Sequence, residues 1–271
     1  MPGPLTLLVD NGSLEPAATL ALRGLATKLS HRLGHTVEPV SLLHSSGIDL
    51  KLLDGCPAEI LVPALEQRLA AGQNDFIVVP LFFGPSRALT VYVPENVARL
   101  RTKYPALNLR LAPPLYAPGD VRLALMLADQ VVAELGQRKA TRVALVDHGS
   151  PVPAVTAVRN ELAVQVAALL GDRVAAVAPC SMERRPDPAY DFTAPLLADL
   201  LAAPWWSESH VIVAMQFLLP GRHAGLTGDV ARICRVAEAA HPGLSTRMTQ
   251  LVGAHPLLVE ILADRWRAAN L

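Results

Sequence analysis

Short apolar, β-branched stretches alternate along the chain with longer stretches of helical period. This alternation is typical of parallel strands joined by crossover helices. Parallel strands are covered on both faces, so their unbroken apolar character fits the same interpretation. For the second half, the pattern predicts strands at 142–147, 173–179, 210–217 and 245–249, and helices at 153–170, 194–203, 228–240 and 256–269. The first half is expected to repeat this order between residues 5 and 135.

The two halves of the chain are similar in sequence. The motif Val-Asp-Asn-Gly-Ser at 9–13 recurs as Val-Asp-His-Gly-Ser at 146–150, an offset of 137 residues. Further matches at this offset are Pro16 with Pro153, Thr19 with Thr156, Leu25 with Leu162, Gly34 with Gly171 and Val37 with Val174. A period this long indicates duplicated domains rather than a solenoid.

The polar stretch 136–141 is the natural boundary between the repeats. We therefore expect an N-terminal lobe over residues 1–138 and a C-terminal lobe over residues 139–271. The predicted fold class is α/β, with two tandem lobes that each hold a small four-stranded parallel sheet flanked by helices.

Length and composition agree with two folded lobes and exclude several functions. A chain of 271 residues predicts about two domains, and 51% hydrophobic against 18% charged residues excludes disorder. Lys and Arg number 24, as do Asp and Glu, so no basic field attracts nucleic acid. Aromatic residues make up only 4%, which leaves few platforms for stacking bases.

The three cysteines, Cys56, Cys180 and Cys234, form no Cys-x-x-Cys pair. A disulfide framework or a structural zinc site is therefore not expected. The start of the sequence lacks a basic region, and the longest apolar runs are under half the length that crosses a bilayer. We expect a cytoplasmic protein with no signal peptide and no membrane partner.

Candidate chemical groups follow three predicted strands of the second half. His148 follows the first strand, Glu183 lies just past the second, and His223 lies in a loop after the third, between two glycines. Ligands of open parallel sheets bind beyond the carboxyl ends of the strands, so these side chains are placed to meet. Two imidazoles and a carboxylate suit an open site for a divalent first-row metal ion.

Each of these residues also has a purely structural interpretation. His148 and His223 would then be ordinary loop residues, and Glu183 would belong to a solvated charge cluster with Arg184 and Arg185. The functional interpretation is favoured for both histidines, because one precedes Gly-Ser at a strand end and the other is flanked by glycines. For Glu183 the two interpretations are closer.

The sequence argues against two other chemistries. The segment Asp-His-Gly-Ser at 147–150 contains the residue types of a hydrolase triad, but neighbouring strand residues point to opposite faces and no Gly-x-Ser-x-Gly motif is present. No phosphate-binding loop of the Gly-x4-Gly-Lys-Ser/Thr type and no Gly-x-Gly-x-x-Gly motif occurs either. We therefore expect chemistry without a nucleotide.

The order of these motifs resembles the class II, ATP-independent tetrapyrrole chelatases, in particular the sirohydrochlorin cobaltochelatase and ferrochelatase group. Leu-Val-Gly-Ala-His-Pro-Leu-Leu-Val-Glu at 251–260 also resembles the Gly-x-His-Pro-Leu-Leu ending of that group. The resemblance covers nearly the whole chain. It implies insertion of Co²⁺, Fe²⁺ or Ni²⁺, as a substrate, into a modified tetrapyrrole held in the cleft between the lobes. It also implies that His148, Glu183 and His223 are the catalytic and metal-binding residues.

The chemistry of metal insertion assigns roles to these groups. Neutral imidazole binds a divalent metal ion and still releases it, and a group that titrates near neutral pH can accept the two pyrrole protons. We expect His148 to accept protons, and His223 and Glu183 to bind the metal ion or relay protons. The first half offers Asn11, Ser46, and Arg87 or Ala88 at the matching positions. Its site is therefore predicted to be degenerate, so that this lobe only helps to enclose the tetrapyrrole.

Arginine is prominent in the second half, which contains eleven arginines and no lysine beyond Lys139. Modified tetrapyrroles carry many carboxylates, and the guanidinium fork matches a carboxylate. We expect Arg184, Arg185 and Arg222 to bind the substrate, with Arg87 as a further candidate. Plain solvation of these side chains is the alternative.

Two other functions remain open from the sequence. A non-catalytic metal or tetrapyrrole carrier would keep the fold and the ligands without turnover. An unrelated α/β protein that binds a small molecule would carry these histidines incidentally. Turnover with free metal ion separates the chelatase from the carrier, and failure to bind either metal or porphyrinoid would leave the third function.

Overall fold

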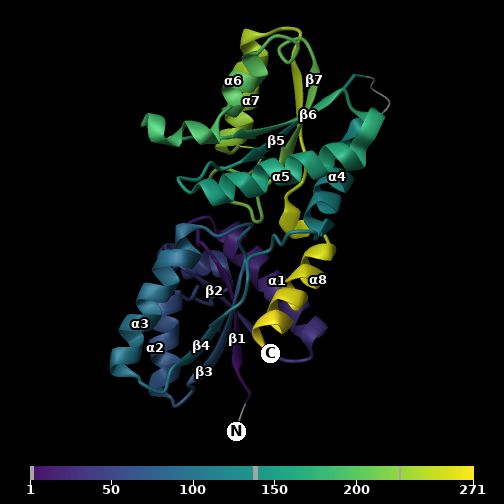
Figure 1. The fold of residues 1–271 in the computed structure, drawn as a ribbon. Coiled ribbons are helices and arrows are strands. Elements are labelled where there is room, and N and C mark those ends of the chain that lie inside the picture. Colours follow the sequence, from purple (N-terminus) through teal and green to yellow (C-terminus); the bar gives the residue numbers. More distant parts are fainter. Residues whose placement is uncertain (1–2, 137–139, 226) are drawn as a thin grey trace. The chain divides into compact units, whose positions relative to one another are not determined.

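The computed structural model describes residues 3–136, 140–225 and 227–271 (Figure 1). Two compact units are present, one built from the residues up to 117 together with 256–271, and one from residues 118–255. Each unit contains a four-stranded, all-parallel sheet flanked by helices. The predicted fold class is therefore confirmed.

The sheet of the first unit has the strand order β2-β1-β3-β4. Its strands are β1 (Leu5–Asp10), β2 (Val37–Ser41), β3 (Asp75–Pro80) and β4 (Asn108–Leu111). Its α-helices are α1 (Pro16–Leu33), α2 (Leu61–Ala70), α3 (Val93–Lys103) and α8 (Leu257–Ala269). Shorter helical turns cover Ser45–Gly47 and Leu50–Leu53, and a π-helical turn covers Ala88–Tyr92.

The sheet of the second unit has the equivalent order β6-β5-β7-β8. Its strands are β5 (Arg142–Asp147), β6 (Ala176–Ser181), β7 (His210–Met215) and β8 (Ser245–Met248). Its α-helices are α4 (Arg122–Leu135), α5 (Pro153–Leu170), α6 (Leu197–Ala202) and α7 (Asp229–Ala240). Turns of 3-10 helix cover Gly171–Arg173, Pro188–Thr193 and Val252–Ala254.

Both faces of each sheet are covered by helices, as the continuous apolar strands predict. In the second unit, α6 and α7 pack on one face of the sheet, where Val146, Val213 and Met215 are completely buried (Figure 1). The other face is covered by α5 and α4. In the first unit, α2 and α3 cover one face and α1 and α8 the other. This burial of aliphatic side chains is the main contribution to the stability of both units.

The compact units divide the chain differently from the sequence repeats. Helix α4 follows the first repeat's last strand, yet it packs against α5 and β7 of the second unit. Helix α8 ends the second repeat and packs against α1 and β3 of the first unit, where Trp266 Nε1 donates a hydrogen bond to Thr6 Oγ1 at 2.9 Å. The boundary predicted between residues 138 and 139 itself lies outside the described residues.

The strand register corrects one part of the predicted repeat alignment. Thr6 pairs with Val37 in the first sheet, and Val143 pairs with Val177 in the second. Val37 therefore corresponds to Val177 rather than to Val174, because the 3-10 turn Gly171–Arg173 adds residues before β6. This turn also explains why β6 begins later than the predicted strand at 173–179. Within the described residues, no helix has the length and hydropathy needed to cross a bilayer.

Candidate functional site

The candidate site lies at the carboxyl ends of β5 and β7 in the second unit. The strand order β6-β5-β7 means that the chain leaves β5 toward one side of the sheet and later returns on its other side. Ligands of such sheets generally bind beyond the carboxyl ends of the strands at a reversal of this kind. His148 follows β5 directly, and His223 lies in the loop that follows β7.

A tight turn after β5 places His148 beside Glu183. Gly149 has φ = 93°, and a Cβ atom at this position would lie 1.9 Å from the backbone oxygen of Glu183. Only glycine allows this approach. The backbone N–H of Glu183 donates to the carbonyl of His148 at 3.2 Å, and His148 Nε2 lies 3.4 Å from Glu183 Oε1. These backbone contacts thus place the side chain of Glu183 beside His148.

Hydrogen bonds fix the same tautomer in both histidines. His148 Nδ1 lies 2.9 Å from the carbonyl oxygen of Gly149, and His223 Nδ1 lies 2.7 Å from Asp229 Oδ2. Carbonyl and carboxylate oxygens can only accept, so Nδ1 donates in both contacts. The lone pair of each neutral ring is then on Nε2, which is the atom available to a metal ion or a proton.

The three predicted site residues come together in the structure. The His148 and His223 rings are 4.7 Å apart between centroids and meet edge to face, with an interplanar angle of 76°. The His148 and Glu183 side chains are 50% and 58% exposed, whereas that of His223 is 29% exposed. Solvent can therefore reach all three side chains.

The described part of the chain contains no cluster of three His, Cys, Asp or Glu side chains arranged to hold a metal ion. His148 contacts Glu183 and His223 in pairs, which leaves the groups near one another without a closed ligand shell. Structural metal sites are closed, whereas sites that exchange ligands keep open positions.

Asp229 is a site residue that the sequence analysis missed. It is the first residue of α7 and accepts the Nδ1 proton of His223, and this hydrogen bond lowers the pKa of the Asp229 carboxyl. Arg222 Nε and Arg232 Nη2 lie 3.7 and 3.3 Å from the same carboxylate. An acidic residue at the start of a helix, six residues after a loop histidine, was the available signal, but such residues occur commonly to complement the helix dipole.

Replacing Asp229 with alanine should weaken Co²⁺ binding about 10-fold, since partners that orient a ligand histidine contribute about 10–100-fold to metal affinity. The change removes the acceptor that holds the His223 ring. Calorimetric titration with Co²⁺ measures the effect. Asp199→Ala, an exposed first-turn carboxylate of α6, is the matched control. Unchanged affinity in Asp229→Ala would show that His223 is oriented without Asp229.

The predicted substrate-binding arginines differ in their surroundings. Arg184 forms an ion pair with Asp191. Arg185 lies over the ring of Tyr190, 5.3 Å from its centroid, and donates to its hydroxyl at 3.2 Å. Arg222 is 82% exposed. Its side chain is more exposed than that of Arg184, which is 33% exposed.

Comparison with known proteins bears on the same segment. The sequence model of the CbiX family matches residues 142–269. The match covers slightly less than half of the chain, and the matched residues, which are similar to the CbiX family, are called the CbiX segment here. This segment begins at β5 and ends with α8, so the family unit is the sequence repeat rather than the compact unit. No curated protein sequence matches the chain.

Solved structures share the fold over the whole chain. SirB from Bacillus subtilis with Fe³⁺ is 16% identical, with a TM-score of 0.72 over 98% of this chain and 95% of that chain. The sirohydrochlorin chelatase SirB from Bacillus subtilis subspecies spizizenii in complex with cobalt is 17% identical, with a TM-score of 0.69 over 98% and 94%. CbiX, described as the terminal enzyme for siroheme biosynthesis in denitrifying bacteria, is 17% identical, with a TM-score of 0.60 over 98% and 99%. The expected resemblance to tetrapyrrole chelatases is thereby confirmed, and at these identities the structural matches establish the fold.

The first repeat lacks the groups that the CbiX segment carries. Asn11 stands where the CbiX segment has His148. The N–H of Leu43 donates to the Asn11 carbonyl at 3.2 Å, as that of Glu183 does to the His148 carbonyl. A Cβ atom on Gly12 would overlap the backbone oxygen of Leu43, as one on Gly149 would overlap that of Glu183. The counterpart of Glu183 is therefore Leu43, and the predicted match to Ser46 was wrong because of the residues added before β6.

Asp10 marks a further difference between the repeats. It corresponds to Asp147 of the CbiX segment and is equally buried, but within the described residues its Oδ1 atom has no hydrogen-bond partner. Burial raises the pKa of the Asp10 carboxyl to about 6, and hydrogen bonds from Ser41 and Gly12 only partly oppose it. The pKa of Asp147 is also raised by burial, against hydrogen bonding by Ser181 and the charge of Arg159.

The raised pKa of Asp10 predicts a pH-dependent stability. Near pH 4 and below, the buried carboxyl of Asp10 keeps its proton, and its burial has little effect on the free energy of unfolding. As the pH rises toward about 6, the Asp10 carboxyl ionises in the unfolded chain but stays protonated in the folded chain. The free energy of unfolding therefore falls by as much as ~3 kcal/mol. Asp10→Asn should therefore be more stable than wild type above pH 6 and similar to it near pH 4.

Urea unfolding at pH 4 and pH 7 tests this prediction. Asp54→Asn replaces an exposed carboxylate of the same unit and should leave the pH dependence as it is in wild type. An Asp10→Asn variant that keeps the wild-type pH dependence would contradict the prediction.

Proposed function

We propose that this protein inserts a divalent metal ion, Co²⁺ or Fe²⁺, into sirohydrochlorin or a related modified tetrapyrrole without ATP. The observation that carries the proposal is the pair of histidines beyond the strand ends of the second sheet. Both rings hold their Nδ1 proton in a hydrogen bond, which puts the lone pair of a neutral ring on Nε2, and Glu183 Oε1 lies 3.4 Å from Nε2 of His148. The similarity of this segment to the CbiX family and the fold shared with a sirohydrochlorin chelatase support the same activity.

The reaction exchanges one metal ion for two protons. The hydrated ion loses water, binds the four ring nitrogens, and displaces the two protons of the pyrrole N–H groups. In our proposal, Nε2 of His223 and a Glu183 oxygen bind the ion as it sheds water, and Nε2 of His148 accepts the two pyrrole protons one after the other. Glu183 passes each proton from His148 to solvent, since its side chain is exposed and adjacent to His148.

Weak, open binding suits an ion that is a substrate. Three partly exposed groups, without a closed shell among the described residues, hold the ion long enough for dehydration and then release it to the macrocycle. A carrier would use the same groups without turnover, so the rate of insertion separates the two functions.

The arginines beside the site fit an acidic substrate. We propose that Arg222, and Arg185 after it leaves Tyr190, bind carboxylate side chains of the tetrapyrrole. Arg184 contributes only if the substrate displaces Asp191 from it. Arg87 of the first unit immediately precedes the π-helical turn Ala88–Tyr92 and is a further candidate.

A direct assay tests the proposal. Metal-free protein is mixed with sirohydrochlorin and Co²⁺, Fe²⁺ or Ni²⁺ without ATP, and the absorption change is compared with the spontaneous rate. A rate above the spontaneous one that is proportional to protein concentration is expected for at least Co²⁺ or Fe²⁺. Binding of metal and tetrapyrrole with no increase in rate would favour a carrier, and no binding of either would leave an unrelated small-molecule-binding protein.

A further inference from the structure

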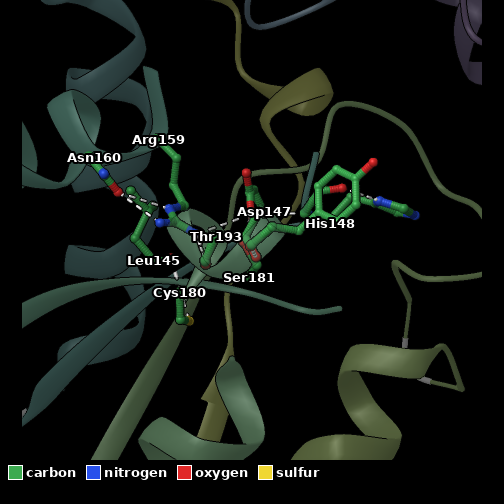
Figure 2. A network of polar contacts seen from close by, with 10 residues as sticks. Leu145, Asp147, His148, Arg159, Asn160, Cys180, Ser181 and Thr193 are labelled. Atoms are coloured by element: carbon green, nitrogen blue, oxygen red, sulfur yellow. Dashed lines mark hydrogen bonds and ion pairs between the residues drawn. The ribbon is translucent and has the colours of Figure 1, made fainter. Parts of the chain in front are cut away.

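A fully buried arginine lies behind the turn that carries His148. Arg159, on α5, has 0% of its surface exposed, although charged side chains are almost never fully buried unless they are paired. Its Nη1 donates to Ser181 Oγ at 2.5 Å and to the Thr193 carbonyl at 2.8 Å, and lies 3.7 Å from Asp147 Oδ1 (Figure 2). One guanidinium nitrogen therefore contacts three separate segments of the chain.

The rest of the guanidinium is held by its neighbour on the same helix. Arg159 Nε and Nη2 donate to Asn160 Oδ1 at 3.1 and 2.8 Å. Figure 2 shows Asn160 on the opposite side of the guanidinium from Asp147 and Ser181. The planar group is thus fixed from two sides, which sets the direction of Nη1.

Each segment that Nη1 contacts leads into the candidate site. Asp147 immediately precedes His148, and its Oδ1 accepts from the Gly149 N–H at 3.1 Å and from Ser181 Oγ at 2.7 Å. Ser181 ends β6, two residues before Glu183. A single carboxylate oxygen therefore joins the histidine turn to the strand end that delivers Glu183, and Arg159 supplies the positive charge beside it.

The third contact holds the loop after β6. Thr193 ends the 3-10 turn Pro188–Thr193, and its carbonyl accepts from Arg159. This loop also carries Arg184 and Arg185. Arg159 therefore contacts the chain at Ser181 and at Thr193, on either side of residues 183–185, which carry a proposed metal ligand and two proposed substrate-binding arginines.

The first repeat provides an internal comparison. Leu22 stands at the position of Arg159 and is buried against the same kind of sheet. The backbone hydrogen bonds of the turn are nevertheless alike, with Leu42 N bonded to Asp10 O at 2.8 Å and Met182 N bonded to Asp147 O at 2.8 Å. The turn thus forms without the arginine, which is present only in the repeat that carries the histidines.

Loop anchoring alone does not explain why the arginine is buried. In the first repeat, Arg23 on α1 donates to the Leu53 carbonyl at 3.1 Å and to the Cys56 carbonyl at 2.7 Å, and so anchors the equivalent loop from the surface. In the second repeat, by contrast, Arg159 is fully buried and lies next to the carboxylate of Asp147. A buried ion pair is seldom the most stabilising choice for such a position, since the charges must be desolvated.

We infer that Arg159 is a positioning residue for metal insertion, which acts through Asp147 and Ser181 to hold the His148 turn and the Glu183 strand end at a fixed separation. The inference rests on the proposed function of the site. Residues that orient the groups binding a metal ion contribute about 10–100-fold to affinity or activity. Arg159→Leu places in the second repeat the residue that the first repeat tolerates at this position.

The experiment compares wild type with Arg159→Leu by three measurements: histidine ring resonances in NMR spectra of the metal-free protein, Co²⁺ affinity, and the kcat of insertion. We expect a folded variant with shifted His148 resonances, loss of the nuclear Overhauser contact between the His148 and His223 rings, and an at least 10-fold fall in Co²⁺ affinity and kcat. Arg23→Leu, which removes the surface anchor of the first repeat, is the matched control and should leave all three unchanged.

Arg159→Lys keeps the charge beside Asp147 but has no fork to reach Ser181 and Thr193 together, so intermediate values are expected. Wild-type resonances, affinity and kcat in folded Arg159→Leu would overturn the inference. If Arg159→Leu does not fold, Arg159→Lys decides, and wild-type values there would overturn it. If the wild-type protein inserts no metal, the proposed function fails, while the ring resonances still report whether Arg159 positions His148.

Discussion

His148→Ala and His223→Ala should each lower the rate of metal insertion by roughly 10²-fold or more. General acid–base groups contribute about 10²–10⁴-fold, and loss of a ligand that helps to dehydrate the ion adds to this. The two rings meet edge to face, so removing either one leaves the other without its neighbour. The rate with Co²⁺ and sirohydrochlorin, corrected for spontaneous insertion, measures the effect.

Two further variants serve as comparisons for this result. His241→Ala removes a histidine of the same unit that lies between α7 and the start of β8, on the side of the amino ends of the strands, and should keep the wild-type rate. Glu183→Gln should lower the rate less than either histidine variant, because its side chain is exposed and water can replace it in proton relay. Full activity in His148→Ala would refute its role as the proton acceptor.

One Co²⁺ ion should bind specifically per chain, and the double variant His148→Ala/His223→Ala should lose it. The first repeat offers Asn11, Leu43, and Arg87 or Ala88 in place of His148, Glu183 and His223. An amide, an aliphatic side chain, and a guanidinium or a methyl group cannot replace imidazole and carboxylate around a transition metal ion. Calorimetric titration of the metal-free protein gives the stoichiometry directly.

The corresponding change in the first repeat is the control for this titration. Asn11→Ala alters the residue that matches His148 and should leave the single site intact. Two sites of similar affinity per chain, or one site that survives in the histidine double variant, would show that the metal binds elsewhere.

Several features of the fold could be predicted because they depend on local pattern. The strands β5 and β7 and the helix α5 begin where the apolar pattern places them, since a buried parallel strand needs a continuous apolar run and a covering helix needs an apolar stripe. The repeat of Val-Asp-x-Gly-Ser located both strand ends, because glycine is required where the chain turns against a neighbouring backbone. His148 and His223 could be singled out for the same reason.

The side-chain partners of these residues were not predictable in the same way. An acidic residue at the start of a helix is usually a helix-dipole partner, so Asp229 gave no sign that it would accept the His223 proton. Arginine on a helix is usually exposed, and only the folded chain shows Arg159 inside, beside Asp147 and Ser181. These contacts join residues separated by up to 34 positions, and local pattern carries no information at that range.

The helices that cover the two sheets separate what the sequence pattern determines from what only the tertiary structure decides. The apolar faces of α4 and α8 predict two helices that must be buried, and the repeat predicts two sheets with the same strand order. Pattern alone assigns each helix to its own repeat, yet α4 packs in the second unit and α8 in the first. An amphipathic helix specifies that it needs an apolar surface and not which of two similar surfaces it will cover, so this choice depends on packing between segments far apart in the chain.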